Sequence, residues 1–146
     1  MIGLVQRVTE ALVTVADEVV GAIGPGLLVL ECAEPTDGEA QAVKFIDKLL
    51  KLRIFSDAAG RMNRSVVDVG GGLLIVSQFT LAADTSGGNR PSFSGAAGAE
   101  QGQALYERVL ALARERHAPV AAGVFGAAMR VALVNDGPVT IPVRIA

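Results

Sequence analysis

The stretch from Leu73 to Phe93, LLIVSQFTLAADTSGGNRPSF, constrains the fold of this chain more than any other part of the sequence. It opens with a short apolar and β-prone run, LLIV, which is typical of a strand buried on both faces. The polar residues Ser77, Gln78 and Thr80 follow, on either side of Phe79. Because an unpaired hydroxyl or amide in a core costs roughly 1–3 kcal/mol, this pattern predicts either a closed hydrogen-bond network or a solvated site at the strand end. We favour the site.

The length and hydropathy of the chain indicate one domain, residues 1–146, large enough for its own core. Apolar residues make up 51% of the sequence and the mean hydropathy is +0.44. No run approaches the roughly 18 uninterrupted apolar residues of a membrane span. Gln6 and Arg7 also interrupt the position where a signal peptide would be apolar. We therefore expect a cytoplasmic protein without a membrane partner, whose surplus apolar surface is covered in a homodimer.

Cysteine, histidine and charge narrow the chemistry further. The single cysteine, Cys32, lies in an apolar run and is expected to be a small buried side chain, so an internal disulfide and a Cys-based zinc site are excluded. The single histidine, His117, ends a charged helix, which argues against a Ser-His-Asp triad and a multi-His metal site. The net charge of −2 argues against broad nucleic-acid binding, including DNA, but allows contact with one end of an RNA.

Helical periodicity appears twice in the sequence. Residues 36–52 carry apolar residues on one face, and Thr36 and Glu39 have the spacing of a capping box. Residues 100–117 carry a second apolar stripe, and Pro119 follows its end. We expect both segments to be helices.

The remaining apolar segments are short, and turn residues separate them. We read the triplet Gly70 to Gly72 as a hairpin turn rather than a phosphate loop, because a strand and not a helix follows it. The expected fold class is α+β: mostly antiparallel, barrel-like curled sheets with the two helices packed outside, in a dimer. Strands are expected over residues 1–8, 11–15, 19–20, 27–31, 52–55, 62–69, 73–76, 130–135 and 139–145.

Two loops leave alternatives open. The stretch Asn135 to Thr140, NDGPVT, is most simply a tight turn between the last two strands. A cis Gly137–Pro138 bond would instead make it a rigid pair of outward carbonyl acceptors. The loop Gly87 to Phe93 is either a plain connection or a binding loop, since the planar guanidinium of Arg90 suits a phosphate or carboxylate.

Taken together, three motifs resemble those of the D-aminoacyl-tRNA deacylase (D-tyrosyl-tRNA deacylase) family. They are SQFTL at Ser77–Leu81, G-x-R-P-S-F at Gly88–Phe93 and NDGPVT at Asn135–Thr140. The resemblance covers essentially the whole chain, because further matching segments stand in order at Gln6–Val8, Gly21–Val29, Leu52–Phe55 and Met62–Asn63.

This resemblance implies a homodimeric editing hydrolase that needs no metal and no organic cofactor. Such an enzyme cleaves the ester linking a D-amino acid to the 3′-terminal adenosine of tRNA, and also glycine mischarged onto alanine tRNA. Gly137 and Pro138 would form a Gly-cisPro element that enters the partner's pocket and rejects L-amino acids. Arg7 and Asn135 would support that element.

The resemblance also implies roles for the pocket residues. Ser77, Gln78, Phe79 and Thr80 would form the catalytic stretch. Thr80 would act as nucleophile, or the N–H groups of Phe79 and Thr80 would form an oxyanion hole for attack by a water that the tRNA 2′-hydroxyl assists. We favour the second mechanism, because these stretches contain no acid–base side chain. Further substrate-binding residues would be Phe125, Met129 and Arg90, and Ala128 departs from the family's usual aspartate.

Two alternatives to this function make different demands on the sequence. A non-catalytic dimeric module that binds RNA or a small ligand would use the same pocket without hydrolysis. A lone-serine esterase would need a G-x-S-x-G motif, which the sequence lacks.

Overall fold

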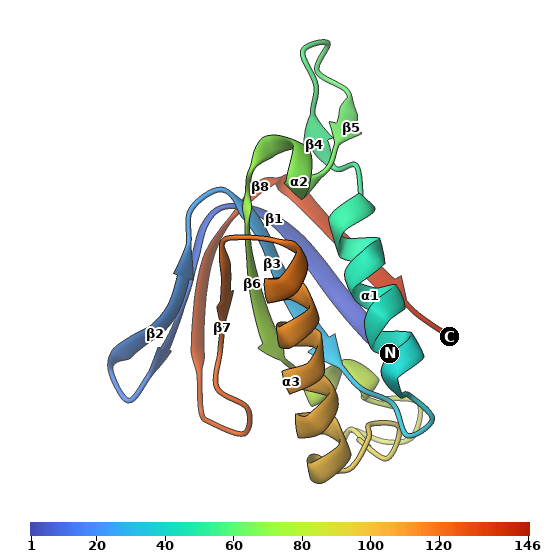
Figure 1. The fold of residues 1–146 in the computed structure, drawn as a ribbon. Helices are drawn as coiled ribbons and strands as arrows, with labels where there is room; N and C mark the ends of the chain where they lie inside the picture. Colours follow the sequence, from blue (N-terminus) through green and yellow to red (C-terminus); the bar gives the residue numbers. More distant parts are fainter.

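A mixed sheet and two long helices make up the computed structural model, which describes residues 1–146 (Figure 1). The strands are β1 (Ile2–Val15), β2 (Glu18–Ile23), β3 (Gly26–Cys32), β4 (Phe55–Ser56), β5 (Met62–Arg64), β6 (Gly72–Ser77), β7 (Val120–Ala122) and β8 (Arg130–Arg144). The helices are α1 (Glu39–Lys51), the short α2 (Val66–Val69) and α3 (Ala99–Arg116), with a 3₁₀ turn, η1 (Phe79–Ala82). No helix is both long and apolar enough to cross a membrane.

Strand β1 organises the sheet because it pairs with three others. Its first half pairs antiparallel with β3 and its second half with β2, while β8 pairs along its other edge. On the far side of β3, strands β6 and β7 are added in parallel. Gly21 of β2 passes so close to Ala122 of β7 that a side chain would not fit between them. The sheet is thus curled nearly into a barrel.

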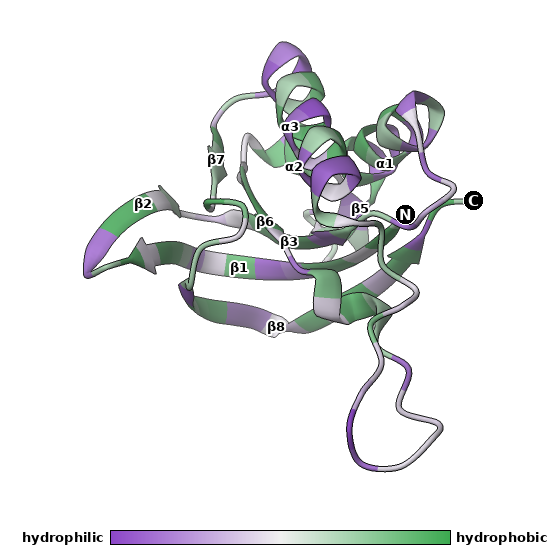
Figure 2. Cartoon of the chain, turned by 90° about the horizontal axis from the view of Figure 1, so that it is seen from below, coloured by the Kyte–Doolittle hydropathy of each residue, from purple (hydrophilic) through white to green (hydrophobic).

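Helices α1 and α3 pack on one side of the sheet, and β8 is the outermost strand on the other side (Figure 2). The apolar face of α1 is buried in a cluster of 21 residues that also takes in α3, β3 and β6. A second cluster of 7 buried residues fills the inside of the curl. Leu73 and Ile75 belong to the first cluster, and Leu74 and Val76 to the second. The expectation that this strand is buried on both faces is therefore confirmed.

The α+β class and both long helices agree with the sequence analysis, but the strand arrangement differs in several respects. The sheet is mixed: β1 pairs antiparallel with β2, β3 and β8, as expected, but β3 with β6 and β6 with β7 are parallel, because α1 and α3 each lie in a crossover between these strands. The expected strands 1–8 and 11–15 form one strand, β1, and 130–135 and 139–145 form one strand, β8. Each continues because it keeps the other as a pairing partner along most of its length.

Four local expectations were wrong. The expected strand 52–55 is absent, because β4 is limited to Phe55–Ser56. Helix α1 begins at Glu39 with Gly38 as its N-cap, whose N–H donates to Gln41 Oε1 at 2.8 Å, so Thr36 is not the cap. The segment 62–69 is not one extended stretch: it holds β5 and then α2, which Ser65 caps. The triplet at 70–72 is not a hairpin turn, because Gly70 ends α2 in the left-handed region and β6 then runs parallel to β3.

Gly26 marks the closest approach of β3 and β6 and provides a test of the packing. A Cβ atom on Gly26 would overlap the Gly72 carbonyl, whereas one on nearby Gly24 would meet nothing within 4 Å. We expect Gly26→Ala to lower the free energy of unfolding by roughly 2 kcal/mol, because the two backbones must separate. Gly24→Ala should change it by less than about 0.5 kcal/mol. Urea unfolding of both variants measures the difference, and equal stabilities would contradict this packing.

Candidate active site

A pocket of about 530 Å³ opens at the carboxyl ends of the parallel strands β3 and β6. Loops at this end of parallel strands are a common place for ligand binding. Its walls are mainly apolar, and the polar groups are few. The large apolar side chains are Val76, Phe79, Phe93, Phe125, Met129 and Val131, and the small residues include Ala96, Ala97, Ala99 and Gly102. The polar residues are Glu31, Ser77 and Gln78.

The end of β6 brings three of the predicted residues to this pocket. Ser77, Gln78 and Phe79 line it, while Thr80 is exposed beside it. Gln78 connects the two strands, because its backbone N–H donates to the Glu31 carbonyl at 2.6 Å. Its side-chain Nε2 also donates to Thr80 Oγ1 at 2.6 Å. The backbone N–H groups of Phe79 and Thr80 lie in the first turn of η1, where a helix offers them no partner.

The loop after η1 returns to the pocket through Phe93. The Phe79 and Phe93 rings meet edge to face, with centroids 5.1 Å apart. The loop is closed at its base by Asp84 and Ser92, whose backbones exchange two hydrogen bonds of 2.8 and 2.9 Å. Arg90 lies in the exposed part of this loop, does not line the pocket, and forms no hydrogen bond or ion pair.

The segment between β7 and β8 supplies the opposite wall. Phe125 and Met129 both line the pocket. The Phe125 ring lies 6.1 Å from that of Tyr106, whose hydroxyl donates to the Ile75 carbonyl at 2.6 Å. Burial, and to a lesser degree the charge of Glu31, raises the pKa of Tyr106 to about 12, so this hydroxyl stays neutral. Ala128 lies outside the pocket.

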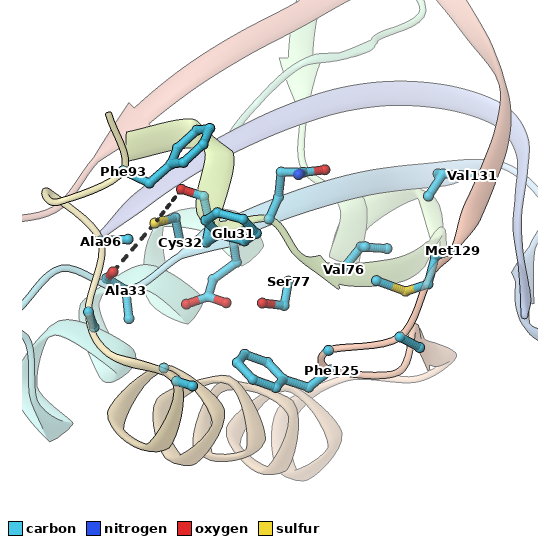
Figure 3. A pocket seen from close by; sticks show the side chains of 17 residues that line it. Glu31, Cys32, Ala33, Val76, Ser77, Phe93, Ala96, Phe125, Met129 and Val131 are labelled. Atoms are coloured by element: carbon cyan, nitrogen blue, oxygen red, sulfur yellow. Dashed lines mark hydrogen bonds between the residues drawn. The ribbon is translucent and has the colours of Figure 1, made fainter. Parts of the chain in front are cut away.

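Glu31 is a pocket residue that the sequence analysis missed. It is 1% exposed, and its carboxyl and the Ser77 hydroxyl point into the same space, opposite Phe125 (Figure 3). The two residues are register partners in the β3–β6 pair, which puts their side chains on one face. No group of the protein forms a hydrogen bond with the carboxyl, and Oε1 is fully buried. The available signal was a lone charge inside an apolar run, since isolated charges are rarely buried.

Burial, with a smaller effect of the Asp37 charge, raises the pKa of Glu31 to about 7. The carboxyl is therefore about half neutral near pH 7. Cys32 follows it in β3 and is buried as expected, with its thiol directed at the carbonyl oxygens of Ala33 (3.4 Å) and Phe79 (3.6 Å). Burial and the neighbouring acidic groups raise the pKa of Cys32 to about 11, so it is not a thiolate nucleophile at neutral pH.

Neither His117 nor the acidic residues form a second catalytic or metal-binding site. The His117 ring nitrogen Nε2 lies 2.6 Å from the Gly71 carbonyl oxygen, at the end of α3, and it does not line the pocket. Nowhere do three or more His, Cys, Asp or Glu side chains meet in a group that could hold a metal ion. His117 therefore joins α3 to the start of β6 and takes no part in the pocket.

The NDGPVT stretch is not a turn between two strands but a bulge within β8. Asn135 pairs with Val8 and Thr140 with Gln6, so the four residues between them loop out opposite Arg7. The Gly137–Pro138 peptide bond is cis, and both residues are exposed. Neither lines the pocket of its own chain.

Two side chains hold this bulge. Asn135 Oδ1 accepts from the Val139 N–H at 2.7 Å, and its Nδ2 donates to Thr140 Oγ1 at 2.9 Å. Arg7 donates from Nε to the Asp136 carbonyl at 2.9 Å and from Nη1 to the Ile54 carbonyl at 2.7 Å. The bulge is thus anchored to β1 and to the segment before β4.

The pKa of Glu31 makes stability depend on pH in a defined direction. Because the pKa is raised from 4.5 to about 7, the folded protein holds this proton more tightly than the unfolded chain. The carboxyl therefore lowers stability progressively as pH rises from about 4.5 to about 7. We expect Glu31→Gln to match the wild type near pH 4.5 and to be more stable by roughly 3 kcal/mol near pH 8.

Urea unfolding at several pH values measures this difference. The exposed Glu18→Gln replacement controls for loss of a negative charge. If the stability of Glu31→Gln and of the wild type had the same pH dependence, the carboxyl would not be uncompensated in the folded protein.

Comparison with known proteins identifies the family. The family model described as D-Tyr-tRNA(Tyr) deacylase matches residues 4–144. A protein of Methylibium petroleiphilum named D-aminoacyl-tRNA deacylase is 71% identical over 145 residues, which are 99% of this chain and 95% of that protein. A protein of the same name from Azoarcus sp. is 66% identical over 99% of this chain and 96% of its own length.

Two solved structures share the fold of this chain. The structure of a c-Myc DNA unwinding element binding protein superposes with a TM-score of 0.95 at 40% identity, over 100% of this chain and 99% of that one. A probable eukaryotic D-amino acid tRNA deacylase gives a TM-score of 0.84 over 99% of this chain and 98% of its own, and at 20% identity this shows the fold alone. The chain belongs to the D-Tyr-tRNA(Tyr) deacylase family.

Proposed function

We propose that this protein is a D-aminoacyl-tRNA deacylase. It hydrolyses the ester between a D-amino acid and the 3′-terminal adenosine of tRNA, and so releases free D-amino acid and tRNA as a proofreading step of translation in the cytoplasm. The observation that carries this proposal is the family match over residues 4–144, which includes both the pocket residues and the β8 bulge. Phe125 and Met129 contact the tRNA 3′ end inside the pocket. Arg90 lies outside the pocket and contacts the part of the tRNA that remains outside it.

The chemistry requires a stabilised oxyanion and an attacking oxygen. We assign the first role to the backbone N–H groups of Phe79 and Thr80, at the start of η1. The attacking oxygen belongs to a water molecule that the tRNA 2′-hydroxyl assists. The water oxygen bonds to the carbonyl carbon and the ester C–O bond breaks. The 3′-oxygen then takes the proton that the water loses. Thr80 is less suited to attack, because Gln78 already donates to its hydroxyl oxygen and no base accepts its proton.

The choice between D- and L-amino acids is assigned to the bulge at Gly137 and Pro138. Because these residues are exposed and do not line their own pocket, we propose that they enter the pocket of a second copy in a homodimer. Their carbonyl groups bind the α-amino group and leave no space for an L-side chain. Glycine passes this filter, so glycine mischarged onto alanine tRNA is also a substrate. Apolar surface on β8, including Val134 at 48% exposure, supports association through this strand.

The activity is tested directly with D-aminoacyl-tRNA and its L-counterpart. We expect the wild-type protein to deacylate the D-form and glycyl-tRNA, and to leave the L-form intact, because only an L-side chain meets the bulge. Release of labelled amino acid from tRNA measures the rates. Tight binding of the tRNA without hydrolysis of any form would indicate a non-catalytic RNA-binding module instead.

The same assay tests the filter through Arg7. In Arg7→Ala the Asp136 carbonyl of the bulge loses its hydrogen bond from this side chain, and the side chain's second bond, to Ile54, is lost with it. We expect the ratio of D- to L-hydrolysis to fall by about tenfold or more. Arg53→Ala is the matched control, since Arg53 is exposed and forms no hydrogen bond or ion pair. Unchanged discrimination in Arg7→Ala would remove the supporting role of this residue.

Variants of Thr80 separate the two mechanisms. If water attacks, Thr80→Ala should retain a single-turnover rate within about tenfold of the wild type, because only the hydrogen bond from Gln78 is lost. Thr80→Ser keeps a hydroxyl and serves as the control. A rate loss of about 10³-fold in Thr80→Ala but not in Thr80→Ser, with folding intact by circular dichroism, would make Thr80 the nucleophile.

A further inference from the structure

The carboxyl of Glu31 carries the one fully buried polar side-chain atom of the pocket for which the protein supplies no partner. It is 1% exposed, and no side chain or backbone group forms a hydrogen bond with it. A buried polar group without a partner costs free energy, and such groups in proteins are nearly always paired. The carboxyl points into the pocket beside Ser77 (Figure 3), so the partner it lacks can come from a bound ligand.

The walls around this carboxyl suit a flat ring. Phe79 and Phe93 meet edge to face on one side, and Phe125 and Met129 lie on the other. Side chains of this kind hold nucleobases by stacking and by contact with sulfur. The pocket volume of about 530 Å³ is within the range of small-molecule sites. A planar base would pack against the aromatic walls with its faces, and its hydrogen-bonding edge would supply the partner that the Glu31 carboxyl lacks.

We propose that Glu31 determines the base specificity of this pocket, by pairing with the edge of the tRNA 3′-terminal adenine that carries the 6-amino group and a ring nitrogen. The carboxyl oxygen accepts from the amino group, and the carboxyl O–H donates to the ring nitrogen. This inference rests on the proposed function, because that function supplies the adenosine. Glu31 takes no part in bond breaking under it.

The protonation state favours adenine over an ammonium group as the partner. Burial raises the pKa of Glu31 to about 7, and the negative charge of Asp37 adds to the effect. The amino terminus at Met1 opposes it without cancelling it. The other titratable groups beside the carboxyl are Cys32 and Tyr106. Their pKa values are raised, so both are neutral near pH 7. A neutral acid offers one donor and one acceptor, which adenine matches, whereas an ammonium group requires the ionised form.

The first test uses the wild-type protein with adenosine and with purine riboside, which has hydrogen in place of the 6-amino group. Titration calorimetry or NMR gives the two dissociation constants. We expect adenosine to bind about tenfold more tightly, the discrimination typical of a good bidentate contact between a side chain and a base. Its affinity should be constant below about pH 6 and fall above about pH 7, as Glu31 loses its proton.

Two variants test the residue itself. Glu31→Gln keeps a donor and an acceptor at the same place, so it should bind adenosine within about threefold of the wild type near pH 6 and lose the pH dependence. Glu31→Leu should bind adenosine and purine riboside equally. Melting temperatures establish that both variants are folded, and the comparison of the two ligands on the wild type needs no variant.

Other outcomes would overturn the inference. Equal binding of adenosine and purine riboside by the wild type, or no binding of adenosine, would show that Glu31 does not read the base. An adenosine affinity that rises with pH and is lost in Glu31→Gln would show that the ionised carboxylate contacts the base, and would contradict the pairing of a neutral acid with adenine. These measurements do not involve hydrolysis. A protein that binds adenosine through Glu31 but cleaves no aminoacyl-tRNA would contradict the proposed function and leave the base contact in place.

Discussion

The parallel pairing of β3 with β6 is the interaction on which the rest of the structure depends. It joins residues 26–32 to residues 72–77, and both strands are buried on both faces. Strands paired in parallel end at the same edge of the sheet, so this contact brings Glu31 and Ser77 together. The pocket exists because β6 ends there in η1 and because the segment before β8 closes over the gap.

The second organising contact is the long pairing of β1 with β8. Pairing resumes on both sides of the bulge, so the residues between Asn135 and Thr140 are forced outward. Arg7 and Asn135 then replace the ladder hydrogen bonds that the bulge interrupts. A segment held at both ends and from within projects from the sheet in one shape, which is the property that the proposed chiral filter requires.

The pocket also shows a conflict between stability and binding. A carboxyl without a partner in an apolar surrounding opposes folding, and an apolar side chain in its place would relieve that cost. Such departures from local stability are concentrated at binding and catalytic sites, where a ligand supplies the missing contact. Glu31 has this character, whereas the buried Tyr106 hydroxyl nearby is fully paired to the backbone.

The sequence by itself determined the features that depend on local patterns. Apolar periodicity predicted the helices at 36–52 and 100–117, close to the observed 39–51 and 99–116, and the apolar run before Ser77 predicted a doubly buried strand. The motif order indicated the family. Only the tertiary structure decided the parallel pairing, the continuity of β1 and β8, and the place of Glu31 in the pocket. These depend on which strands meet across some 45 to 140 residues of chain, and such contacts leave no signal in local periodicity.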